Sequence, residues 1–250
     1  MSRRLHSAHG APGLWLYGLH AVRAALGNPR RKVNRAVLTA HAADAIGRPL
    51  LSRVRHEIAP AEAVARLLPA GAVHQGAALS CEALPARNLA DVLNEAPVGR
   101  RVVAILDQIS DPQNVGAILR SAAAFGIAAV IVQDRHAPPE SGTLAKAASG
   151  ALDIVPYVPV VNIARVLEEL GKLDFWRIAL AGDGEQTLAE VVPAGDGAIV
   201  LGSEGAGLRR LVRERCDTAA FIPVEKEMES LNVSNAAAIA FYELRRAPTA

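Results

Sequence analysis

The 250-residue chain contains few cysteines, no long hydrophobic run and almost no net charge. Its two cysteines, Cys81 and Cys216, form no CxxC pair and have no pair of histidines nearby, which disfavours a disulfide scaffold and a structural zinc site. No stretch approaches the roughly 20 apolar residues of a membrane span, and residues 1–12 lack the apolar segment of a secretory signal. We therefore expect a cytoplasmic, soluble protein that holds no metal.

Aromatic residues are also scarce, at 4% of the chain, whereas hydrophobic residues make up 51% and charged residues 21%. So much apolar material excludes a disordered chain. A core built mainly from Ala, Val, Leu and Ile suits helices that alternate with buried strands better than an aromatic-rich β-sandwich. Because domains commonly run to roughly 100–200 residues, the length suits a small domain joined to a larger one.

The formal charge of +2 is the sum of two unlike halves. Residues 1–99 carry 12 Lys and Arg against 6 Asp and Glu, a net charge of +6, and residues 100–250 carry 15 against 19, a net charge of −4. A basic half favours contact with a polyanion such as nucleic acid, and a merely solvated basic surface is the alternative. The scarcity of aromatics favours contacts to backbone phosphates over base stacking.

The hydrophobic pattern changes near residue 100. We expect a flexible tail over residues 1–12, a small α/β domain over 13–90, a linker over 91–99 and a larger domain over 100–250. The elements predicted before residue 100 are a helix that ends at Gly27, a strand over 33–39, helices over 42–51, 60–68 and 89–93, and a strand that starts at Val73.

The larger domain shows a regular alternation of strands and helices. Strands are predicted over 102–106, 129–132, 154–155, 177–180 and 198–201, and helices over 115–125, 144–148 and 162–170. This alternation is typical of a parallel sheet with helices on both faces. In such open sheets, ligands bind at the loops that follow the carboxyl ends of the strands, and three loops of this kind are unusual.

The first loop follows strand 102–106 and opens a helix with Asn114 near its start and Arg120 six residues later. Six residues are close to two helical turns, a separation that lets the long Arg120 side chain fold back across the loop. An asparagine at a helix start is a common cap, so this loop alone fits a capped helix with a solvated arginine equally well.

The second loop follows strand 198–201 and reads Gly202-Ser203-Glu204-Gly205-Ala206-Gly207. Its three glycines allow the backbone to approach a ligand closely. The spacing is not the GxGxxG of dinucleotide-binding proteins, no P-loop Lys-Ser or Lys-Thr follows, and Leu201 stands where a nucleophile elbow needs glycine. The missing fingerprint and the missing ribose-binding acidic pattern disfavour an NAD-linked oxidoreductase. His136 is the only histidine after residue 99, which disfavours a Ser-His-Asp hydrolase.

The third loop follows a short strand predicted over 221–224 and holds four hydroxyl or amide side chains within six positions. These are Ser230, Asn232, Ser234 and Asn235, at the entrance of an alanine-rich helix. One such residue suffices as a helix cap, and capping does not account for all four.

Together, the three loops resemble the three motifs of the SpoU (TrmH-type) RNA ribose 2′-O-methyltransferases in order and in spacing. The resemblance covers residues 100–246, and the segment from Tyr17 to Val22 is similar to the start of the L30e-like substrate-binding domain that many members carry. It implies a SPOUT fold, in which the C-terminal segment of a parallel sheet is threaded as a trefoil knot, and a homodimer formed through the knotted region. It also implies S-adenosylmethionine as the cofactor and RNA as the substrate.

The same resemblance implies site residues. The catalytic set would be Asn114, Arg120, Glu204, Ser230 and Asn232, and the cofactor would be held by Leu201, Gly202, Ser203, Gly207, Ile222 and Leu231. Arg120 is the family's candidate base, but a guanidinium stays protonated, so we interpret it as a group that fixes the phosphate and stabilises the developing oxyanion.

The third motif departs from the family pattern in two ways. Val224 follows Pro223 where members usually have methionine, and Glu225, Lys226 and Glu227 fill the loop where a glycine is usual. Asn235 follows Ser234 where members often have a small apolar residue. These departures concern the geometry of the loop more than the identity of the cofactor.

The layout of the whole chain is most similar to the branch that methylates a guanosine in the peptidyl-transferase region of 23S ribosomal RNA. A tRNA ribose methyltransferase is the alternative substrate assignment, and a non-catalytic RNA-binding or ribosome-assembly module is the alternative class. The joint presence of Asn114, Arg120, Glu204 and Asn232 favours an enzyme, because a pure binding module has no need for that polar set.

Overall fold

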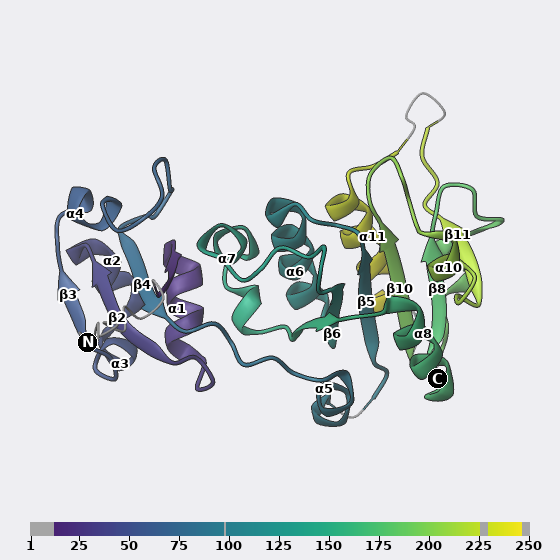
Figure 1. Ribbon diagram of the computed structural model, residues 1–250, viewed down its shortest axis with the longest axis horizontal. Coiled ribbons are helices and arrows are strands. Elements are labelled where there is room, and N and C mark those ends of the chain that lie inside the picture. Colours follow the sequence, from purple (N-terminus) through teal and green to yellow (C-terminus); the bar gives the residue numbers. More distant parts are fainter. Residues whose placement is uncertain (1–12, 98, 226–229, 247–250) are drawn as a thin grey trace, which may run out of the picture.

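The computed structural model describes residues 13–97, 99–225 and 230–246, which form two β-sheets with their helices (Figure 1). The smaller sheet is N-terminal, and the larger sheet carries the three candidate loops. The expected tail over residues 1–12 lies outside the described residues, as do Lys226 and Glu227 of the third loop.

The N-terminal sheet has the strand order β1-β4-β2-β3. Strand β4 is buried throughout and pairs antiparallel with β1 and β2, whereas β3 pairs parallel with β2. The elements of this unit are β1 (Leu14–Tyr17), α1 (Leu19–Gly27), β2 (Val33–Leu38), α2 (Ala40–Ile46), α3 (Arg48–Leu51), β3 (His56–Ile58), α4 (Ala61–Ala65) and β4 (Ala77–Cys81).

Two predictions for the N-terminal unit were wrong. The single helix expected over 42–51 is two helices, because Gly47 between them has a φ of 91°, which an α-helix cannot contain. The strand expected from Val73 begins only at Ala77, because Gln75 and Gly76 both have positive φ and turn the chain first. Strands β1 and β3 were not predicted.

The larger sheet confirms the predicted parallel architecture. Its seven strands within the described residues are all paired in parallel, in the order β7-β6-β5-β10-β8-β11-β9. The central strands are buried almost throughout, as expected for strands with helices on both faces. The strands are β5 (Val102–Asp107), β6 (Ala129–Gln133), β7 (Tyr157–Val160), β8 (Trp176–Leu180), β9 (Gln186–Thr187), β10 (Gly197–Gly202) and β11 (Thr218–Phe221).

Helices cover this sheet and lead into it. They are α5 (Leu89–Glu95), α6 (Pro112–Phe125), α7 (Gly142–Ala148), the 3-10 helix η1 (Ala151–Asp153), α8 (Ile163–Lys172), α9 (Leu188–Val191), α10 (Arg210–Arg213) and α11 (Val233–Arg246). Helix α5 occupies the first part of the expected linker, and α7 lies between α6 and the N-terminal unit (Figure 1).

Two strand positions in the larger sheet differ from the prediction. Ile154 and Val155 belong to a turn after η1, and the strand starts beyond Pro156, at Tyr157. Ile154 is 68% exposed, so its apolar character does not mark a sheet position. The strand expected over 221–224 ends at Phe221, in keeping with Pro223, which has no N–H to donate to a ladder.

The described residues contain no helix long and apolar enough to cross a membrane, and no group of three or more His, Cys, Asp or Glu side chains that could hold a metal ion.

Both cysteines are free thiols. Burial raises the pKa of Cys81 to about 11 and that of Cys216 to about 12, so both thiols stay protonated near neutral pH.

Candidate active site at the carboxyl ends of the central strands

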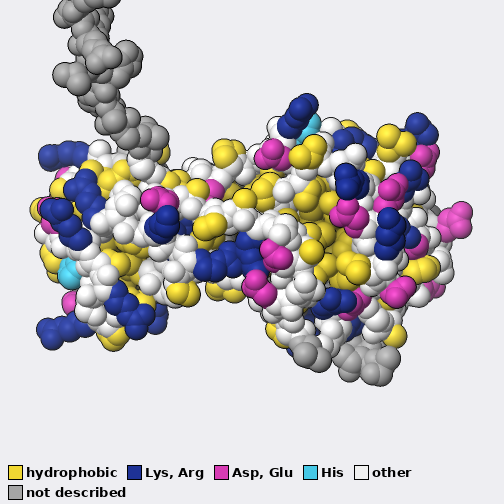
Figure 2. All heavy atoms as spheres, turned by 60° about the horizontal axis from the view of Figure 1, so that its bottom comes forward, with side chains coloured by type: hydrophobic (Ala, Val, Ile, Leu, Met, Phe, Trp, Pro, Cys, Tyr) yellow, Lys and Arg dark blue, Asp and Glu magenta, His cyan; other side chains and the backbone are white. Residues whose placement is uncertain are grey.

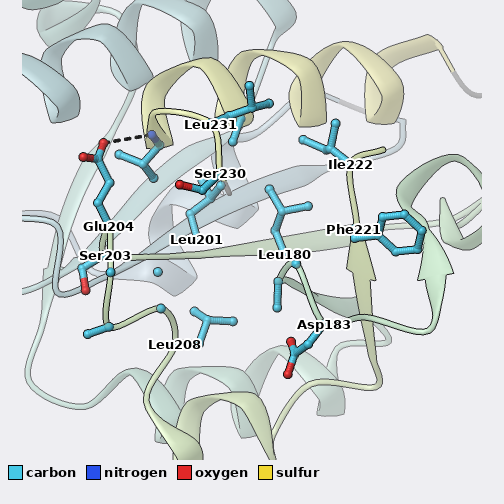
Figure 3. A pocket seen from close by; sticks show the side chains of 18 of the residues that line it. Leu180, Asp183, Leu201, Ser203, Glu204, Leu208, Phe221, Ile222, Ser230 and Leu231 are labelled. Atoms are coloured by element: carbon cyan, nitrogen blue, oxygen red, sulfur yellow. Dashed lines mark hydrogen bonds between the residues drawn. The ribbon is translucent and has the colours of Figure 1, made fainter. Parts of the chain in front are cut away.

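A cavity of about 530 Å³ lies at the carboxyl ends of β8, β10 and β11 (Figure 3). Its volume falls in the range of roughly 300–1,000 Å³ typical of small-molecule sites. The loop after β10 forms one wall, the loop after β8 another, and the residues after β11 and before α11 close it. The second and third candidate loops therefore meet around one cavity, as their positions after parallel strands predicted.

The loop after β10 folds tightly onto itself. The N–H of Gly207 donates to the carbonyl of Ser203 at 2.9 Å, and a Cβ added at Gly202 would lie 2.4 Å from the carbonyl carbon of Gly207. Gly205 and Gly207 have φ values of 86° and 64°, a left-handed backbone that glycine adopts without strain. No larger residue fits at Gly202 without moving the backbone of the loop.

A buried ion pair fixes the far end of this loop. Asp107, the last residue of β5, is fully buried and accepts hydrogen bonds from Arg209 at the backbone N–H (2.9 Å) and at Nε (2.8 Å). The Arg209 side chain keeps 37% of its surface exposed. The end of β5 therefore holds the start of α10, 102 residues later in the sequence.

Three polar residues from the three loops form one hydrogen-bonded cluster. The side-chain amide of Asn232 donates to Asn114 Oδ1 at 3.0 Å and to Glu204 Oε1 at 2.8 Å. The same Glu204 oxygen accepts the backbone N–H of Val233 at 3.2 Å, drawn as the dashed line in Figure 3. This carboxylate thus caps the start of α11 while it orients an amide that faces the first loop.

Arg120 lies on α6 beyond this cluster. Helix α6 begins at Asp111, whose side chain accepts the N–H of Asn114 at 3.0 Å, so Asp111 and not Asn114 is the cap. Gly116 faces α7, where an added Cβ would lie 2.4 Å from the Cβ of Ala147. Arg120 is exposed and makes no hydrogen bond or ion pair with any residue that the structure describes, so its charge is available to a ligand.

Most of the predicted site residues line the cavity. These are Leu201, Gly202, Ser203, Glu204, Gly207, Ile222, Ser230 and Leu231. Asn114 and Asn232 are connected to it through Glu204, and Arg120 stands apart on the exposed side of α6. The cavity therefore has a mixed apolar and polar lining, and Arg120 lies outside it on an exposed helix face.

The loop after β8 also belongs to the site, although the sequence motifs did not point to it. Leu180, Ala181, Gly182 and Asp183 line the cavity, as does Arg213 from α10. Arg213 Nη1 lies 2.7 Å from both carboxylate oxygens of Asp183, and these hydrogen bonds hold the pKa of Asp183 below its usual range. The strand over 177–180 was predicted, so the rule that ligands bind after strand ends was a signal that could have found this loop.

The arrangement suits a ligand with an apolar or aromatic part and polar ends. Leu180, Leu201, Ile222 and Leu231 supply apolar walls, and the glycine-rich loop exposes backbone groups at close range. The ion pair of Asp183 with Arg213 contributes polar groups of both signs at one side of the cavity. A second molecule can reach Glu204 and Arg120 from outside.

Both parts of the chain match models of known protein families. Residues 101–242 match the model of the SpoU rRNA Methylase family, and residues 15–86 match that of the RNA 2'-O ribose methyltransferase substrate binding family. A protein of Ralstonia nicotianae named 23S rRNA (guanosine-2'-O-)-methyltransferase RlmB is 37% identical over 92% of this chain and 94% of its own length. The protein of that name from Xanthomonas campestris pv. campestris is 45% identical over 69% of this chain and 70% of its own.

Solved structures show the same fold. The SpoU methyltransferase AviRb from Streptomyces viridochromogenes in complex with the cofactor AdoMet superposes with a TM-score of 0.77 at 24% identity, covering 94% of this chain and 90% of that one. A TrmH-family RNA methyltransferase structure from Porphyromonas gingivalis, described as putative, superposes with a TM-score of 0.75 at 26% identity, with coverages of 94% and 90%.

Proposed function

The chain belongs to the SpoU rRNA methylase family, and from this membership we propose that it transfers the methyl group of S-adenosylmethionine to the ribose 2′-hydroxyl of a guanosine in 23S rRNA. The observation that carries the proposal is that the second and third motif loops line one cavity, whose edge is joined to the first loop by the hydrogen bonds of Asn232 to Glu204 and to Asn114. The relatives that match nearly the whole chain bear the name of that activity.

The residues of the cavity fit S-adenosylmethionine. Leu201, Ile222 and Leu231 would hold the adenosine part, and Gly202, whose missing side chain lets the loop after β10 fold tightly onto itself, keeps that loop at the cavity wall. The Asp183–Arg213 ion pair lies at the other side of the cavity and adds polar groups to its lining. When bound, the cofactor supplies a methyl group on a positively charged sulfur. This fit rests on the size of the cavity, on its apolar walls and on the hydrogen-bonding groups in its lining.

The chemistry left to the protein is to position a ribose 2′-hydroxyl and to stabilise the charge that grows on its oxygen. No histidine lines the described part of the cavity, and a guanidinium is a poor general base, so we assign Arg120 to electrostatic stabilisation and to the neighbouring phosphate. Glu204 Oε1 is committed to Asn232 and Val233, which leaves Oε2 to accept the hydroxyl hydrogen bond. Asn114 would bind the ribose, and Ser230 would complete the pocket.

Methyl transfer from radiolabelled S-adenosylmethionine to 23S rRNA tests this assignment. Arg120→Ala should lower kcat about 100-fold or more, as expected when a preorganised charge at an oxyanion is removed. Arg165→Ala is the matched control, because Arg165 is an exposed arginine on α8 that pairs only with Glu169 among the described residues. Turnover of Arg120→Ala close to that of the control would refute the assignment of Arg120 to stabilisation of the oxyanion.

The identity of the RNA needs a separate experiment. We propose 23S rRNA over tRNA because the relatives that cover most of the chain carry 23S rRNA in their names. The site of action would then be the cytoplasm. Mapping 2′-O-methylation in rRNA and tRNA from cells with and without the protein distinguishes the two substrates, and loss of a mark in tRNA alone would overturn the assignment. If no mark changes, the non-catalytic alternative gains support.

We propose that residues 13–90 form the RNA-binding domain. Their match to a substrate-binding family and their basic composition support this division. Figure 2 shows several groups of Lys and Arg side chains over this unit. A protein whose exposed arginines there are replaced should lose RNA affinity with a reduced salt dependence, because each phosphate contact contributes to the salt slope.

We also propose that the chain forms a homodimer through the larger domain and that its C-terminal segment is threaded as a trefoil knot. Helix α11 exposes Ile239 (39%) and Tyr242 (52%), and the Tyr242 ring lies 6.0 Å from that of Phe125 on α6. An exposed apolar face of this kind suits a second copy. Sedimentation of Tyr242→Asp should give a monomer, and Leu173→Asp, on exposed apolar surface of another helix end, should not.

A further inference from the structure

A buried arginine lies where the N-terminal unit meets the larger domain. The side chain of Arg31, which follows α1, is fully buried. Its Nε donates to Asp153 Oδ1 at 3.0 Å, and its Nη1 donates to the carbonyl of Glu82 at 3.1 Å and to the carboxylate of Glu140. Asp153 and Glu140 belong to the larger domain, so one guanidinium ties together both units.

The partners of Arg31 are themselves held from the N-terminal side. Asn28 Nδ2 donates to Asp153 Oδ1 at 3.0 Å, and the backbone N–H of Leu84 donates to Glu140 Oε2 at 2.8 Å. Asp153 is 2% exposed and Glu140 is 12% exposed. Carboxylates so deeply buried are tolerated only when they are paired and hydrogen-bonded, so this cluster is stable only while the two units stay docked.

Three glycines allow the same two surfaces to approach closely. An added Cβ would lie 2.6 Å from Lys146 at Gly18, 2.4 Å from the Tyr17 ring at Gly142, and 2.9 Å from Ala24 at Gly150. The hydrophobic core is also continuous, because buried residues of α1 and of α6 belong to one cluster. Interlocked surfaces of this kind fix an orientation, whereas a flexibly tethered domain needs no such fit.

RNA has no access to the guanidinium of Arg31, whose side chain is 0% exposed. The guanidinium is buried between two carboxylates, and the three side chains together carry one positive and two negative charges. Phosphates are therefore bound elsewhere on the N-terminal unit, where arginines such as Arg30 are exposed. Arg31 can influence RNA methylation only through the position of that unit.

We propose that Arg31 is a positioning residue that determines substrate specificity, because it fixes the distance between the RNA-binding surface of the N-terminal unit and the methyl-transfer site. This inference rests on the proposed function. An RNA is methylated efficiently only when the segment bound by the N-terminal unit and the target ribose are separated by the distance built into the protein. The enzyme thus selects its substrate by the spacing of two RNA elements as well as by local contacts.

A spacing series in the RNA tests the proposal. The substrate is a transcript of the peptidyl-transferase region of 23S rRNA, with one to three base pairs inserted between the target guanosine and the segment that the protein protects from cleavage. For the wild-type enzyme, kcat/KM should fall about tenfold or more with the insertions, since small misplacements of a reacting group are costly. With Arg31→Met, KM for the parent RNA should rise while kcat is retained, and the dependence on spacing should flatten.

Three further variants distinguish an effect of the position of the N-terminal unit from an effect of the charge at residue 31. Asp153→Asn disturbs the same cluster from the larger domain and should also flatten the spacing dependence. Arg31→Lys keeps the charge but cannot reach all three acceptors, so it should be intermediate. Arg30→Met removes the same charge from an exposed neighbour and should keep the wild-type spacing dependence even if it weakens RNA binding. Flattening by Arg30→Met as well would overturn the proposal.

Hydrogen exchange provides a readout that does not depend on activity. The amide of Leu84 is protected by Glu140, so Arg31→Met should accelerate its exchange while amides of the buried strand β10 stay protected. Failure of the wild-type protein to methylate any RNA would refute the proposed function but leave this docking measurement intact. An Arg31→Met protein with native exchange at Leu84 and an unchanged spacing dependence would refute the role of Arg31.

Discussion

The ion pair between Asp107 and Arg209 yields a prediction that depends on unequal burial. Asp107 is fully buried, and the Arg209 side chain is 37% exposed. Arg209→Met leaves an unpaired carboxylate without access to water, and breaking a buried pair in this way costs about 3–5 kcal/mol. Asp107→Ala leaves an arginine that can still reach solvent, so its cost should be about 1–3 kcal/mol, mostly from lost hydrogen bonds to a charged group.

The double variant should be less destabilised than the sum of the two single variants, because removing Asp107 relieves the buried charge that Arg209→Met creates. Urea unfolding of the four proteins measures these free energies. Calorimetry with S-adenosylmethionine reports the consequence for the site: both single variants should bind more weakly, because the loop after β10 loses the anchor at its far end. A larger loss of stability for Asp107→Ala than for Arg209→Met would refute the reasoning from burial.

Three further predictions concern the glycine-rich loop, the polar cluster and the response to acid. Gly202→Ala should abolish binding of S-adenosylmethionine in a calorimeter, because its Cβ meets backbone 2.4 Å away, whereas Gly195→Ala, with nothing within 4 Å, should bind normally. Asn232→Ala should lower kcat about 10-fold or more with little change in cofactor affinity, since it removes the amide that links two motif loops, and unchanged kcat in the methylation assay would count against the cluster. Burial raises the pKa of Asp217, but hydrogen bonds from Arg177 outweigh this and hold it below the ordinary 3.8. The stabilisation is therefore complete above that pH and is lost as the pH falls through the lower folded-state pKa, so the stability difference between wild type and Asp217→Asn in urea should shrink below about pH 4.

Local patterns predicted the parts of the fold that depend on local physics. The strand over 102–106 and the helix over 115–125 correspond to β5 and α6, because a continuous apolar run and an amphipathic run closed by a glycine are specified within a few residues. Strand β1 escaped prediction because its apolar run leads almost directly into the pattern of α1, and β3 because its three residues are all exposed and show no apolar alternation. Their pairing partners, not their own sequences, make them strands.

The candidate site likewise has parts that local sequence predicts and parts that it does not. The loops that contain Gly202, Glu204 and Ser230 were recognised by their unusual composition, the family resemblance named these residues, and the structure places all three at the cavity. The contact between Asp107 and Arg209 joins residues 102 positions apart, and no local pattern announces it. Asp183 was missed although its strand was predicted, since a single carboxylate in an ordinary turn gives no compositional signal.

Helix α7 has two neighbours, and this has a consequence for how the protein can evolve or be recombined. One side of its seven residues meets Gly116 of α6 through Ala147, and Gly142 and Lys146 meet the N-terminal unit. A substitution that enlarges the side of α7 facing the N-terminal unit must be compensated in that unit, which is a different domain. Chimaeras that exchange the N-terminal unit with that of a relative should therefore fold best when α7 and η1 are taken from the same relative. The unit that must be exchanged as a whole then includes residues between strands of the larger sheet and does not end at the connecting segment.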